Sequence, residues 1–478
     1  EQMNLFKDMV CYQEEVRDPS RMAEVLNRVI EKAFRGSAPA QINVPRDYWT
    51  QVIDIELPPI VRFERQGGGK EAIENAAKLL SKAKFPVILS GAGVVLGGAI
   101  DECKKLAEKL DAPVCNGYQH NDSFPGSHPL AVGPLGYNGS KAAMELISKA
   151  DVVLALGTRL NPFSTLPGYG IDYWPKKATI IQVDVNPDRI GLTKKVSVGI
   201  CGDSKQVAQQ ILEKLSPDAG NTGREERKNL IHKTKSAWLQ TLSGLDHEED
   251  DPGTVWNKEA RERDKDRMSP RQAWRAIQDA LPQDAIISSD IGNNCAIGNA
   301  YPTFEKPRKY LAPGLFGPCG YGFPAILGAK IGCPNTPVVG FAGDGAFGIS
   351  MNEMSSCARE EWPAITMVIF RNYQWGAEKR NSILWFDDNF VGTELDPELS
   401  YAKVANACGL KGVTCKTMEE TTKAIKESCE DQKKGITTFI EIILNQELGE
   451  PFRRDAMKKP VEVAGINKSD MKSQKSLI

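Results

Sequence analysis

Two oxygen-bearing side chains lie 28 positions apart in the segment of this chain best suited to chemistry. Asp344 stands between two glycines, directly after the apolar run 338–342, which predicts a buried strand. Asn372 follows a second apolar run, 365–370, and a helix is predicted between the two runs, around residues 352–361. A βαβ unit returns the chain in the same direction, so both strands end at one edge of a parallel sheet. Asp344 and Asn372 are therefore expected side by side at an edge where open α/β sheets bind ligands.

One carboxylate, one amide oxygen and one free backbone carbonyl form a hard oxygen site. Such a site suits Mg²⁺, which keeps water and phosphate oxygens in its remaining positions. The alternative is that Gly343-Asp344-Gly345 is an ordinary turn and Asn372 an ordinary strand terminator, since short motifs match often by chance. The spacing, the two flanking strands and the terminal asparagine together favour the metal site.

Two other segments could contact a ligand. Asp290-Ile291-Gly292-Asn293-Asn294 follows the predicted strand 285–289, and its backbone and side-chain amides could hold a diphosphate at a helix start. A helix cap explains the same residues equally well. Residues 314–324 contain four glycines in eleven positions, which suggests backbone packed closely against a flat ligand.

Strand and helix patterns alternate through most of the chain and predict an α/β fold built from parallel-sheet domains. Predicted strands include residues 86–90, 151–156, 180–185 and 439–444. The predicted organisation, in chain order, is the end of a domain at 1–55, a second domain at 70–215, a charged linker at 216–268, a third domain at 269–457 and a polar tail at 458–478.

The glycines near residue 91 do not form a complete dinucleotide-binding fingerprint. The sequence GAGVVLGG, from Gly91 to Gly98, misplaces the third glycine. A structural turn between a strand and a helix is favoured here, with nucleotide binding as the minor alternative.

The composition excludes several classes of function. Of the 478 residues, 41% are hydrophobic and 26% charged, as in soluble globular proteins, and the net charge of −2 gives no basic field for nucleic acid. The sequence contains no apolar run long enough to predict a membrane span. The eleven cysteines are scattered and odd in number, which predicts reduced thiols in a cytoplasmic enzyme.

The Gly343-Asp344-Gly345 motif followed by Asn372 resembles the cofactor motif of the thiamine diphosphate enzymes of the decarboxylase and acetolactate synthase type. Four long stretches are similar to the members of this superfamily that act on sulfoacetaldehyde: residues 7–22, 117–130, 156–175 and 367–397. The resemblance implies thiamine diphosphate and Mg²⁺ as cofactors and a homodimer or homotetramer. It also implies that the pyrimidine-binding domain is largely missing, that the activating glutamate lies upstream of Glu1, and that the polypeptide as written is inactive.

The resemblance also assigns roles to individual residues. Asp344 and Asn372 would supply metal-ligand side chains and Gln374 a main-chain carbonyl. The carbonyl of Gly317 would accept from the exocyclic amine of the cofactor, and Cys319 would lie beneath the thiazolium, where relatives usually carry a larger apolar residue. The residues expected to contact the cofactor are Gly292, Asn293, Asn294, Gly317, Cys319, Gly343, Gly345, Ala346 and Gln374.

Two residues are candidates for catalysis by position in the superfamily. Glu378 stands six residues past Asn372, where relatives have an active-site glutamate, so it is expected to handle protons. The alternative is a surface charge that pairs with Lys379 or Arg380. His120 lies where relatives present the middle domain to the active-site mouth, with a structural role as its alternative. Basic residues at the mouth are expected among Lys379, Arg380, Arg453 and Arg454.

The implied activity converts sulfoacetaldehyde and phosphate to acetyl phosphate and sulfite through an enamine on thiamine diphosphate. An alternative with the same fold is acetolactate synthase or another enzyme that decarboxylates 2-keto acids. An alternative of another class is a non-catalytic nucleotide-binding regulator that uses Gly157-Thr158-Arg159 and Asp184.

Overall fold

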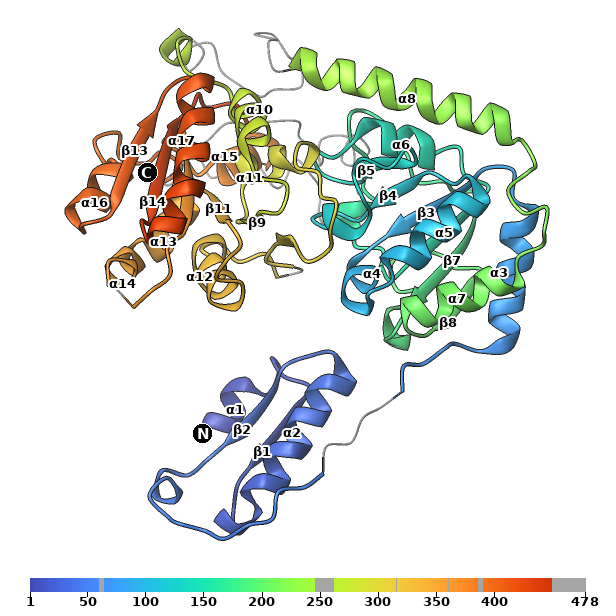
Figure 1. The fold of residues 1–478 in the computed structure, drawn as a ribbon, viewed down its shortest axis with the longest axis horizontal. Helices are drawn as coiled ribbons and strands as arrows, with labels where there is room; N and C mark the ends of the chain where they lie inside the picture. Colours follow the sequence, from blue (N-terminus) through green and yellow to red (C-terminus); the bar gives the residue numbers. More distant parts are fainter. Residues whose placement is uncertain (60–63, 246–261, 315, 360, 386–389, 449–478) are drawn as a thin grey trace, which may run out of the picture.

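The computed structural model describes residues 1–59, 64–245, 262–314, 316–359, 361–385 and 390–448 (Figure 1). The predicted tail at 458–478 and the arginine pair Arg453-Arg454 lie outside these residues. The described part contains three parallel sheets, which confirms the predicted α/β fold class.

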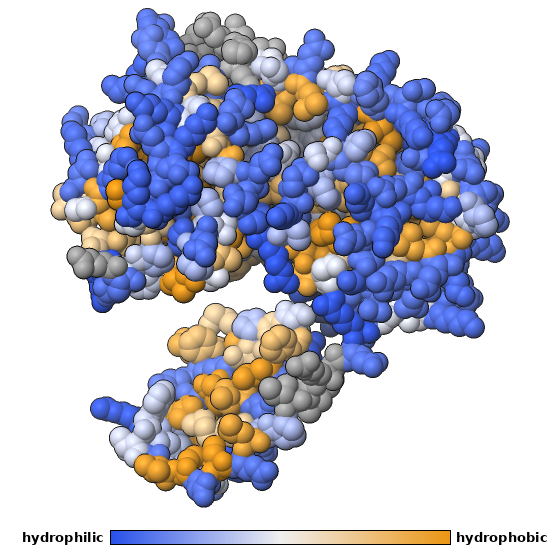
Figure 2. Space-filling view, viewed as in Figure 1, coloured by the Kyte–Doolittle hydropathy of each residue, from blue (hydrophilic) through white to orange (hydrophobic). Residues whose placement is uncertain are grey.

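The N-terminal unit is a two-stranded parallel sheet. Its elements are α1 (Gln2–Phe6), β1 (Tyr12–Glu15), α2 (Met22–Gly36) and β2 (Ala40–Asn43). The core of this unit is small and centres on Val16, Val25 and Val29. Large apolar side chains therefore remain on its surface, among them Phe34 and Trp49. Figure 2 shows hydrophobic residues over much of the visible face of this unit. Apolar surface of this kind is typical of protein interfaces.

The middle domain has a six-stranded parallel sheet in the order β5-β4-β3-β6-β7-β8. The strands are β3 (Pro86–Ser90), β4 (Val114–Asn116), β5 (Ala131–Pro134), β6 (Val152–Leu156), β7 (Thr179–Asp184) and β8 (Val198–Cys201). The helices are α3 (Lys70–Lys82), α4 (Ala92–Gly97), α5 (Ile100–Leu110), α6 (Lys141–Ile147) and α7 (Ser204–Lys214). β3, β6 and β7 are almost fully buried, as expected for parallel strands covered by helices on both faces.

The long helix α8 (Arg224–Leu245) belongs to the charged segment expected to be a solvated connection. It runs along α6 and buries Ile231, Trp238 and Leu242 (Figure 1). Its Arg227 is also buried, and the guanidinium donates to five backbone carbonyls. The helix is therefore partly buried: Ile231 and Arg227 pack on the middle domain, and Trp238 and Leu242 join the core that contains Trp274 and Phe341.

The C-terminal domain has a second six-stranded parallel sheet in the order β10-β9-β11-β12-β14-β13. The strands are β9 (Ile286–Ser289), β10 (Tyr310–Leu311), β11 (Val338–Gly343), β12 (Thr366–Arg371), β13 (Lys411–Cys415) and β14 (Thr438–Ile443). The helices are α10 (Pro270–Ala280), α11 (Asn293–Ile297), α12 (Gly322–Gly332), α13 (Asp344–Ser350), α14 (Met354–Cys357), α15 (Gly376–Trp385), α16 (Tyr401–Ala407) and α17 (Met418–Asp431).

Alternate residues of the central strands enter two separate cores, one on each face of this sheet. Phe341 and Phe370 pack with Trp274 of α10 on one face. Phe439 packs with Phe323 and Phe347 on the other. α10 begins with a proline, and Ser269 caps the helix in a capping box.

No helix in the described ranges is both long and apolar enough to cross a membrane. All eleven cysteines are free thiols, as the sequence predicted.

Candidate active site

Asp344 and Asn372 meet at the carboxyl edge of the C-terminal sheet. β11 pairs with β12 in parallel, with Gly343 opposite Phe370, so the residues after both strands share one edge. The backbone N–H of Tyr373 donates to Oδ2 of Asp344 over 2.6 Å, which fixes the two strand ends against each other. Both side chains are buried. The juxtaposition expected from the spacing is confirmed.

The Asp344 carboxylate is held by three donors. Oδ1 accepts from the N–H of Gly345 over 3.0 Å, and Oδ2 accepts from Nη1 of Arg371 over 3.0 Å and from Tyr373. Burial raises the pKa of Asp344 to about 6, and the positive charge of Arg371 limits that rise. A buried carboxylate with fixed oxygens is a suitable metal ligand.

Gly343-Asp344-Gly345 is not the ordinary turn considered as the alternative for this motif. Gly343 caps α13 with extended backbone, and the helix begins at Asp344 rather than near residue 352. A Cβ on Gly345 would lie 2.8 Å from the indole of Trp375. Gly345 is therefore needed for the close approach of Trp375. Ala346, in the next position, is buried.

The start of α11 faces the loop that follows β12. A Cβ on Gly376 would lie 3.1 Å from Nδ2 of Asn293 and 3.4 Å from Nε2 of Gln374, so the three residues converge. Nδ2 of Asn293, Oδ1 of Asn294 and Oε1 of Gln374 are buried and have no hydrogen-bond partner in the described part of the chain. Buried polar atoms are rarely left unpaired, so these atoms point to a ligand.

Neither asparagine caps α11. Gly292 is the N-cap residue, and its φ of 132° favours glycine. No side chain caps the helix. The helix-cap alternative therefore holds for Gly292 but not for the two asparagine side chains. The hydroxyl of Tyr137, from the middle domain, instead donates to Oδ1 of Asn293 over 3.2 Å.

Asp290 organises the glycine-rich segment and was not singled out by the sequence. Its carboxylate accepts from the N–H of Gly320 over 3.1 Å and from that of Gly322 over 2.7 Å. Burial raises its pKa. Its position directly after β9, which pairs with β11, is the signal that could have identified it.

Gly317 and Cys319 lie in the same glycine-rich segment. Gly317 has a φ of 62°, a conformation that favours glycine. Cys319 is half-buried, and its pKa is raised first by burial and then by the nearby carboxylates of Asp290 and Glu378. Cys319 and Glu378 are thus brought into the same neighbourhood.

Glu378 is exposed on α15, and its two basic neighbours contact other groups. Lys379 pairs with Glu394. The guanidinium of Arg380 is buried over the ring of Tyr137, at 4.6 Å from the ring centroid.

His120 belongs to a segment that docks the middle domain on the C-terminal domain. The side chain of the next residue, Asn121, donates to the carbonyls of Asn299 and Pro302 over 2.9 and 3.2 Å. Oδ2 of Asp122 accepts from the backbone of Lys309 over 3.0 Å. Burial, assisted by the charge of Arg159, lowers the pKa of His120 to about 4. His120 is therefore neutral near pH 7.

The glycines near residue 91 pack against a neighbouring turn of the middle domain. A Cβ on Gly91 would lie 2.6 Å from the carbonyl oxygen of Gly157, and one on Gly93 would lie 2.7 Å from its Cα. These contacts support the structural interpretation of the turn.

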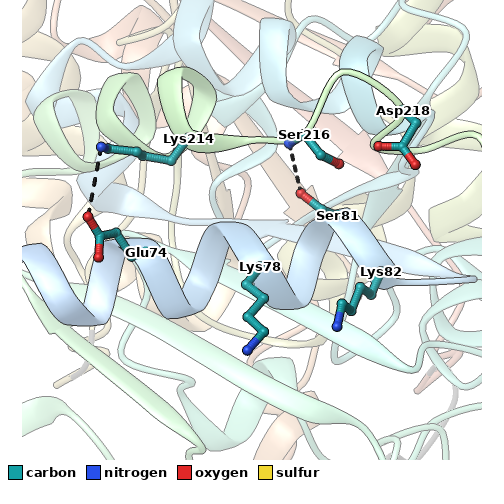
Figure 3. Close-up of a pocket in the computed structure, with 7 residues that line it drawn as sticks. All are labelled: Glu74, Lys78, Ser81, Lys82, Lys214, Ser216 and Asp218. Atoms are coloured by element: carbon teal, nitrogen blue, oxygen red, sulfur yellow. Dashed lines mark hydrogen bonds and ion pairs between the residues drawn. The ribbon is translucent and has the colours of Figure 1, made fainter.

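A surface hollow of about 490 Å³ lies between α3 and α7 in the middle domain (Figure 3). Its lining is hydrophilic and consists of Glu74, Lys78, Ser81, Lys82, Lys214, Ser216 and Asp218. None of the residues predicted to form a site lines it.

Comparison with known families defines the class of the chain. Residues 73–211 match the central domain of thiamine pyrophosphate enzymes, and residues 290–442 match their C-terminal TPP-binding domain. A benzoylformate decarboxylase from Polynucleobacter necessarius has a similar fold, with a TM-score of 0.74 and 21% identity over 94% of this chain and 78% of that chain. The matched domain families, together with the fold, show that the chain is a thiamine pyrophosphate enzyme.

Curated relatives narrow the class. The chain is 77% identical to a probable sulfoacetaldehyde acetyltransferase of Rhizobium meliloti, over 100% of this chain and 81% of the relative. It is 75% identical to a sulfoacetaldehyde acetyltransferase of Roseovarius nubinhibens, over 99% of this chain and 79% of the relative. A probable acetolactate synthase large subunit of Methanocaldococcus jannaschii is only 28% identical, over 89% of this chain and 70% of the relative. The chain belongs to the sulfoacetaldehyde acetyltransferase family.

Proposed function

We propose that the chain acts as a sulfoacetaldehyde acetyltransferase, converting sulfoacetaldehyde and phosphate to acetyl phosphate and sulfite with thiamine diphosphate and Mg²⁺. The observation that carries this proposal is the whole-chain identity of 77%, against 28% for the acetolactate synthase relative. The buried edge at Asp344 and Asn372 provides a suitable place for the cofactors.

The residues at this edge fit the two cofactors. The side chains of Asp344 and Asn372 and the carbonyl of Gln374 offer the oxygen ligands that Mg²⁺ prefers. The unpaired donor Nδ2 of Asn293 suits a phosphate oxygen. Asn294, on the same helix, is proposed to contact the diphosphate.

The remaining predicted contacts surround these residues. Gly343 caps α13, Gly345 and Ala346 lie in its first turn beside the proposed metal ligands, and Gly292 precedes Asn293. Gly317 and Cys319 are proposed to contact the cofactor rings, from the loop that Asp290 holds. When bound, the cofactor supplies a nucleophilic carbon that attacks the aldehyde and stabilises negative charge next to it.

The overall reaction requires proton transfer close to the reacting carbons. The C–S bond breaks and sulfite leaves with the electron pair. The aldehyde hydrogen leaves as a proton, the methylene carbon gains a proton, and the carbonyl carbon forms a bond to a phosphate oxygen. Glu378 is proposed to move one of these protons, since its carboxyl lies close enough to Cys319 to raise the pKa of the thiol. Neutral His120 is proposed to act at the mouth as a hydrogen-bonding group.

Both substrates are anions, so the site needs positive charge. Arg380 is the better of the two described candidates, because it is buried over Tyr137, whose hydroxyl contacts Asn293. Lys379 already pairs with Glu394.

The resemblance to the thiamine diphosphate enzymes supports an oligomeric protein, and the free thiols support a cytoplasmic one. We propose a homodimer or homotetramer in the cytoplasm. The nucleotide-binding regulator is disfavoured, because the chain belongs to the sulfoacetaldehyde acetyltransferase family and carries the proposed metal ligands Asp344 and Asn372.

The substrate can be tested with the purified full-length protein. It is supplied with thiamine diphosphate, Mg²⁺, phosphate and either sulfoacetaldehyde or pyruvate. The proposal predicts sulfite and acetyl phosphate from sulfoacetaldehyde and little CO₂ from pyruvate. Rapid CO₂ release from pyruvate without sulfite formation from sulfoacetaldehyde would favour the acetolactate synthase alternative.

A further inference from the structure

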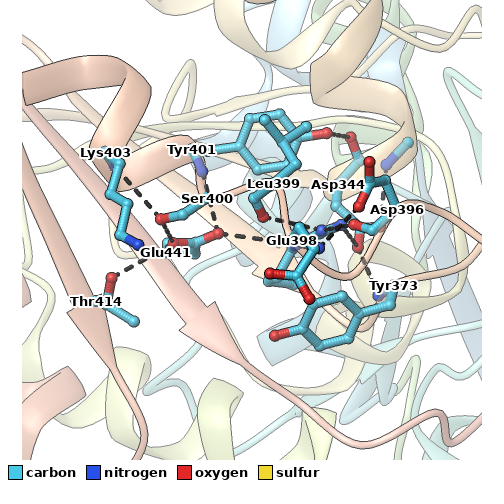
Figure 4. Close-up of polar contacts among 12 residues, drawn as sticks. Asp344, Tyr373, Asp396, Glu398, Leu399, Ser400, Tyr401, Lys403, Thr414 and Glu441 are labelled. Carbon is cyan, nitrogen blue, oxygen red and sulfur yellow. Dashed lines mark hydrogen bonds and ion pairs between the residues drawn. The ribbon is translucent and has the colours of Figure 1, made fainter. Parts of the chain in front are cut away.

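One buried arginine lies between two buried carboxylates behind the candidate metal site. Arg371, the last residue of β12, is 1% exposed, as is Asp344, and Glu441 of β14 is 2% exposed. Nη1 of Arg371 donates to Oδ2 of Asp344 over 3.0 Å, and Nε lies 3.8 Å from Oε1 of Glu441. Figure 4 shows the surrounding polar contacts, with Asp344 and Glu441 on opposite sides of the cluster.

The guanidinium of Arg371 is fixed on its other sides as well. Nη2 donates to the carbonyl of Leu399 over 3.0 Å and to that of Asp396. The ring of Tyr373 covers one face, with its centroid 4.2 Å from Cζ. Both terminal nitrogens of Arg371 are therefore held by hydrogen bonds, whereas Nε has, among the described residues, only the ion pair with Glu441.

Glu441 is held by donors of its own. Oε2 accepts from the hydroxyls of Ser400 and Thr414 over 2.6 and 3.3 Å, and Oε1 accepts from the N–H of Tyr401 over 3.1 Å. The hydroxyl of Tyr401 donates to the backbone carbonyl of Asp344 over 2.9 Å. Contacts thus run in a closed ring from Asp344 through Arg371, Glu441 and Tyr401 back to Asp344.

We propose that Arg371 is a positioning residue, which holds Oδ2 of Asp344 so that Oδ1 is presented to the metal. This inference rests on the proposed function, in which Asp344 is a metal ligand. Oδ1 accepts only a backbone N–H, that of Gly345, in the contacts found among the described residues, and a carboxylate oxygen can accept more than one. Arg371 and the metal can therefore use different oxygens of the same carboxylate.

A lysine cannot replace this arginine. The planar guanidinium donates in several fixed directions, whereas the ammonium of lysine is a compact point charge on a flexible stem. Arg371→Lys would keep the positive charge between the two carboxylates but lose the simultaneous contacts to Asp344, Leu399 and Asp396. Arg371→Lys therefore tests the effect of losing these contacts while the positive charge is kept.

The experiment measures binding of Mg²⁺, in the presence of thiamine diphosphate, to the full-length protein by calorimetry. Arg371→Lys is expected to weaken Mg²⁺ binding about tenfold, which corresponds to the loss of one charge-assisted hydrogen bond. Glu441→Gln, which removes the charge behind Arg371 but keeps a side chain of the same shape, is expected to weaken binding about threefold.

Arg227→Lys is the matched control. Arg227 is also buried and bonded to carbonyls, but it lies in α8 and contacts the middle domain. Its substitution is expected to lower the melting temperature by an amount similar to Arg371→Lys while leaving Mg²⁺ affinity unchanged. The control thus distinguishes a general loss of protein stability from a specific loss of the position of the Asp344 carboxylate.

Asp344→Ala distinguishes failure of this inference from failure of the proposed site. If Asp344→Ala loses Mg²⁺ binding but Arg371→Lys binds Mg²⁺ like wild type, Arg371 does not position the ligand and the inference is wrong. If Asp344→Ala binds Mg²⁺ normally, the proposed metal site itself is wrong. Should Arg371→Lys fail to fold, Glu441→Gln decides, and unchanged Mg²⁺ affinity in that variant overturns the inference.

Discussion

The hydroxyl of Tyr137 donates to Oδ1 of Asn293 across the boundary between the middle and C-terminal domains, over 3.2 Å. Nδ2 of Asn299 also donates to the backbone carbonyl of Tyr137 over 3.3 Å, and Arg380 covers the ring. Because Oδ1 of Asn293 is engaged, the amide is left with its donor, Nδ2, for another group. The middle domain thereby orients an amide that we propose contacts the diphosphate.

Tyr137→Phe removes this hydroxyl but keeps the ring under Arg380. We expect thiamine diphosphate to bind about three- to tenfold more weakly, as for the loss of one hydrogen bond, with the fold intact. Fluorescence quenching of the full-length protein measures the affinity. Tyr169→Phe is the control, since that hydroxyl donates to the carbonyl of Gly139 within the middle domain. Equal cofactor affinity in both variants would show that Tyr137 does not orient Asn293.

Cys319 is half-buried beside Asp290, in the segment proposed to contact the cofactor rings. Cys319→Met should be tolerated, because a free cysteine behaves as a small hydrophobe and methionine is an apolar, adaptable replacement. Cys319→Asp should weaken cofactor binding, because it places a charge against an apolar ring surface. The same substitution at exposed Cys333 is the control. If both Cys319 variants bind the cofactor like wild type, Cys319 lies outside the pocket.

Glu378→Gln keeps the size of the side chain but removes its titrating proton. We predict that turnover of sulfoacetaldehyde falls roughly a hundredfold, the lower range for a general acid or base, with cofactor affinity little changed. Steady-state sulfite release and a cofactor titration measure the two quantities. Glu419→Gln, on the exposed start of α17, is the control. Turnover close to wild type would identify Glu378 as a surface charge.

The lowered pKa of His120 predicts a dependence of stability on pH. Its pKa in the folded protein is about 4, against an ordinary value of 6.5, so the unfolded state binds more protons between these values. The neutral His120 therefore contributes to the free energy of unfolding above pH 6.5, and this contribution is lost as the pH falls toward 4. Its size is on the order of a few kcal/mol.

His120→Gln should reduce this dependence. We expect the melting temperature of wild type to fall more between pH 7.5 and pH 5 than that of the variant. His128→Gln is the control, from the same domain. An equal fall in wild type and His120→Gln would contradict the inferred burial of a neutral imidazole.

The sequence predicted features that depend on order along the chain. The apolar runs placed β11 and β12, and the spacing of Asp344 and Asn372 placed both at one sheet edge. It missed features that arise from packing between elements, such as the Arg371 contact with Asp344 and the Tyr137 contact with Asn293.

Local sequence patterns do not show some roles that depend on packing. Gly345 looked like a turn residue but makes room for Trp375, which no linear pattern shows. The short strands β4 and β10 were not predicted, because two or three residues give no clear periodicity.

The most direct test of this account is a calorimetric titration of the full-length protein with thiamine diphosphate, with and without Mg²⁺. Wild type should bind the cofactor tightly only when Mg²⁺ is present. Asp344→Ala should abolish this Mg²⁺-dependent binding without unfolding the protein, and Asn372→Ala should weaken it in the same direction. Cofactor affinity that is unchanged in Asp344→Ala, or that does not depend on Mg²⁺ in wild type, would contradict a metal and cofactor site at this edge of the sheet.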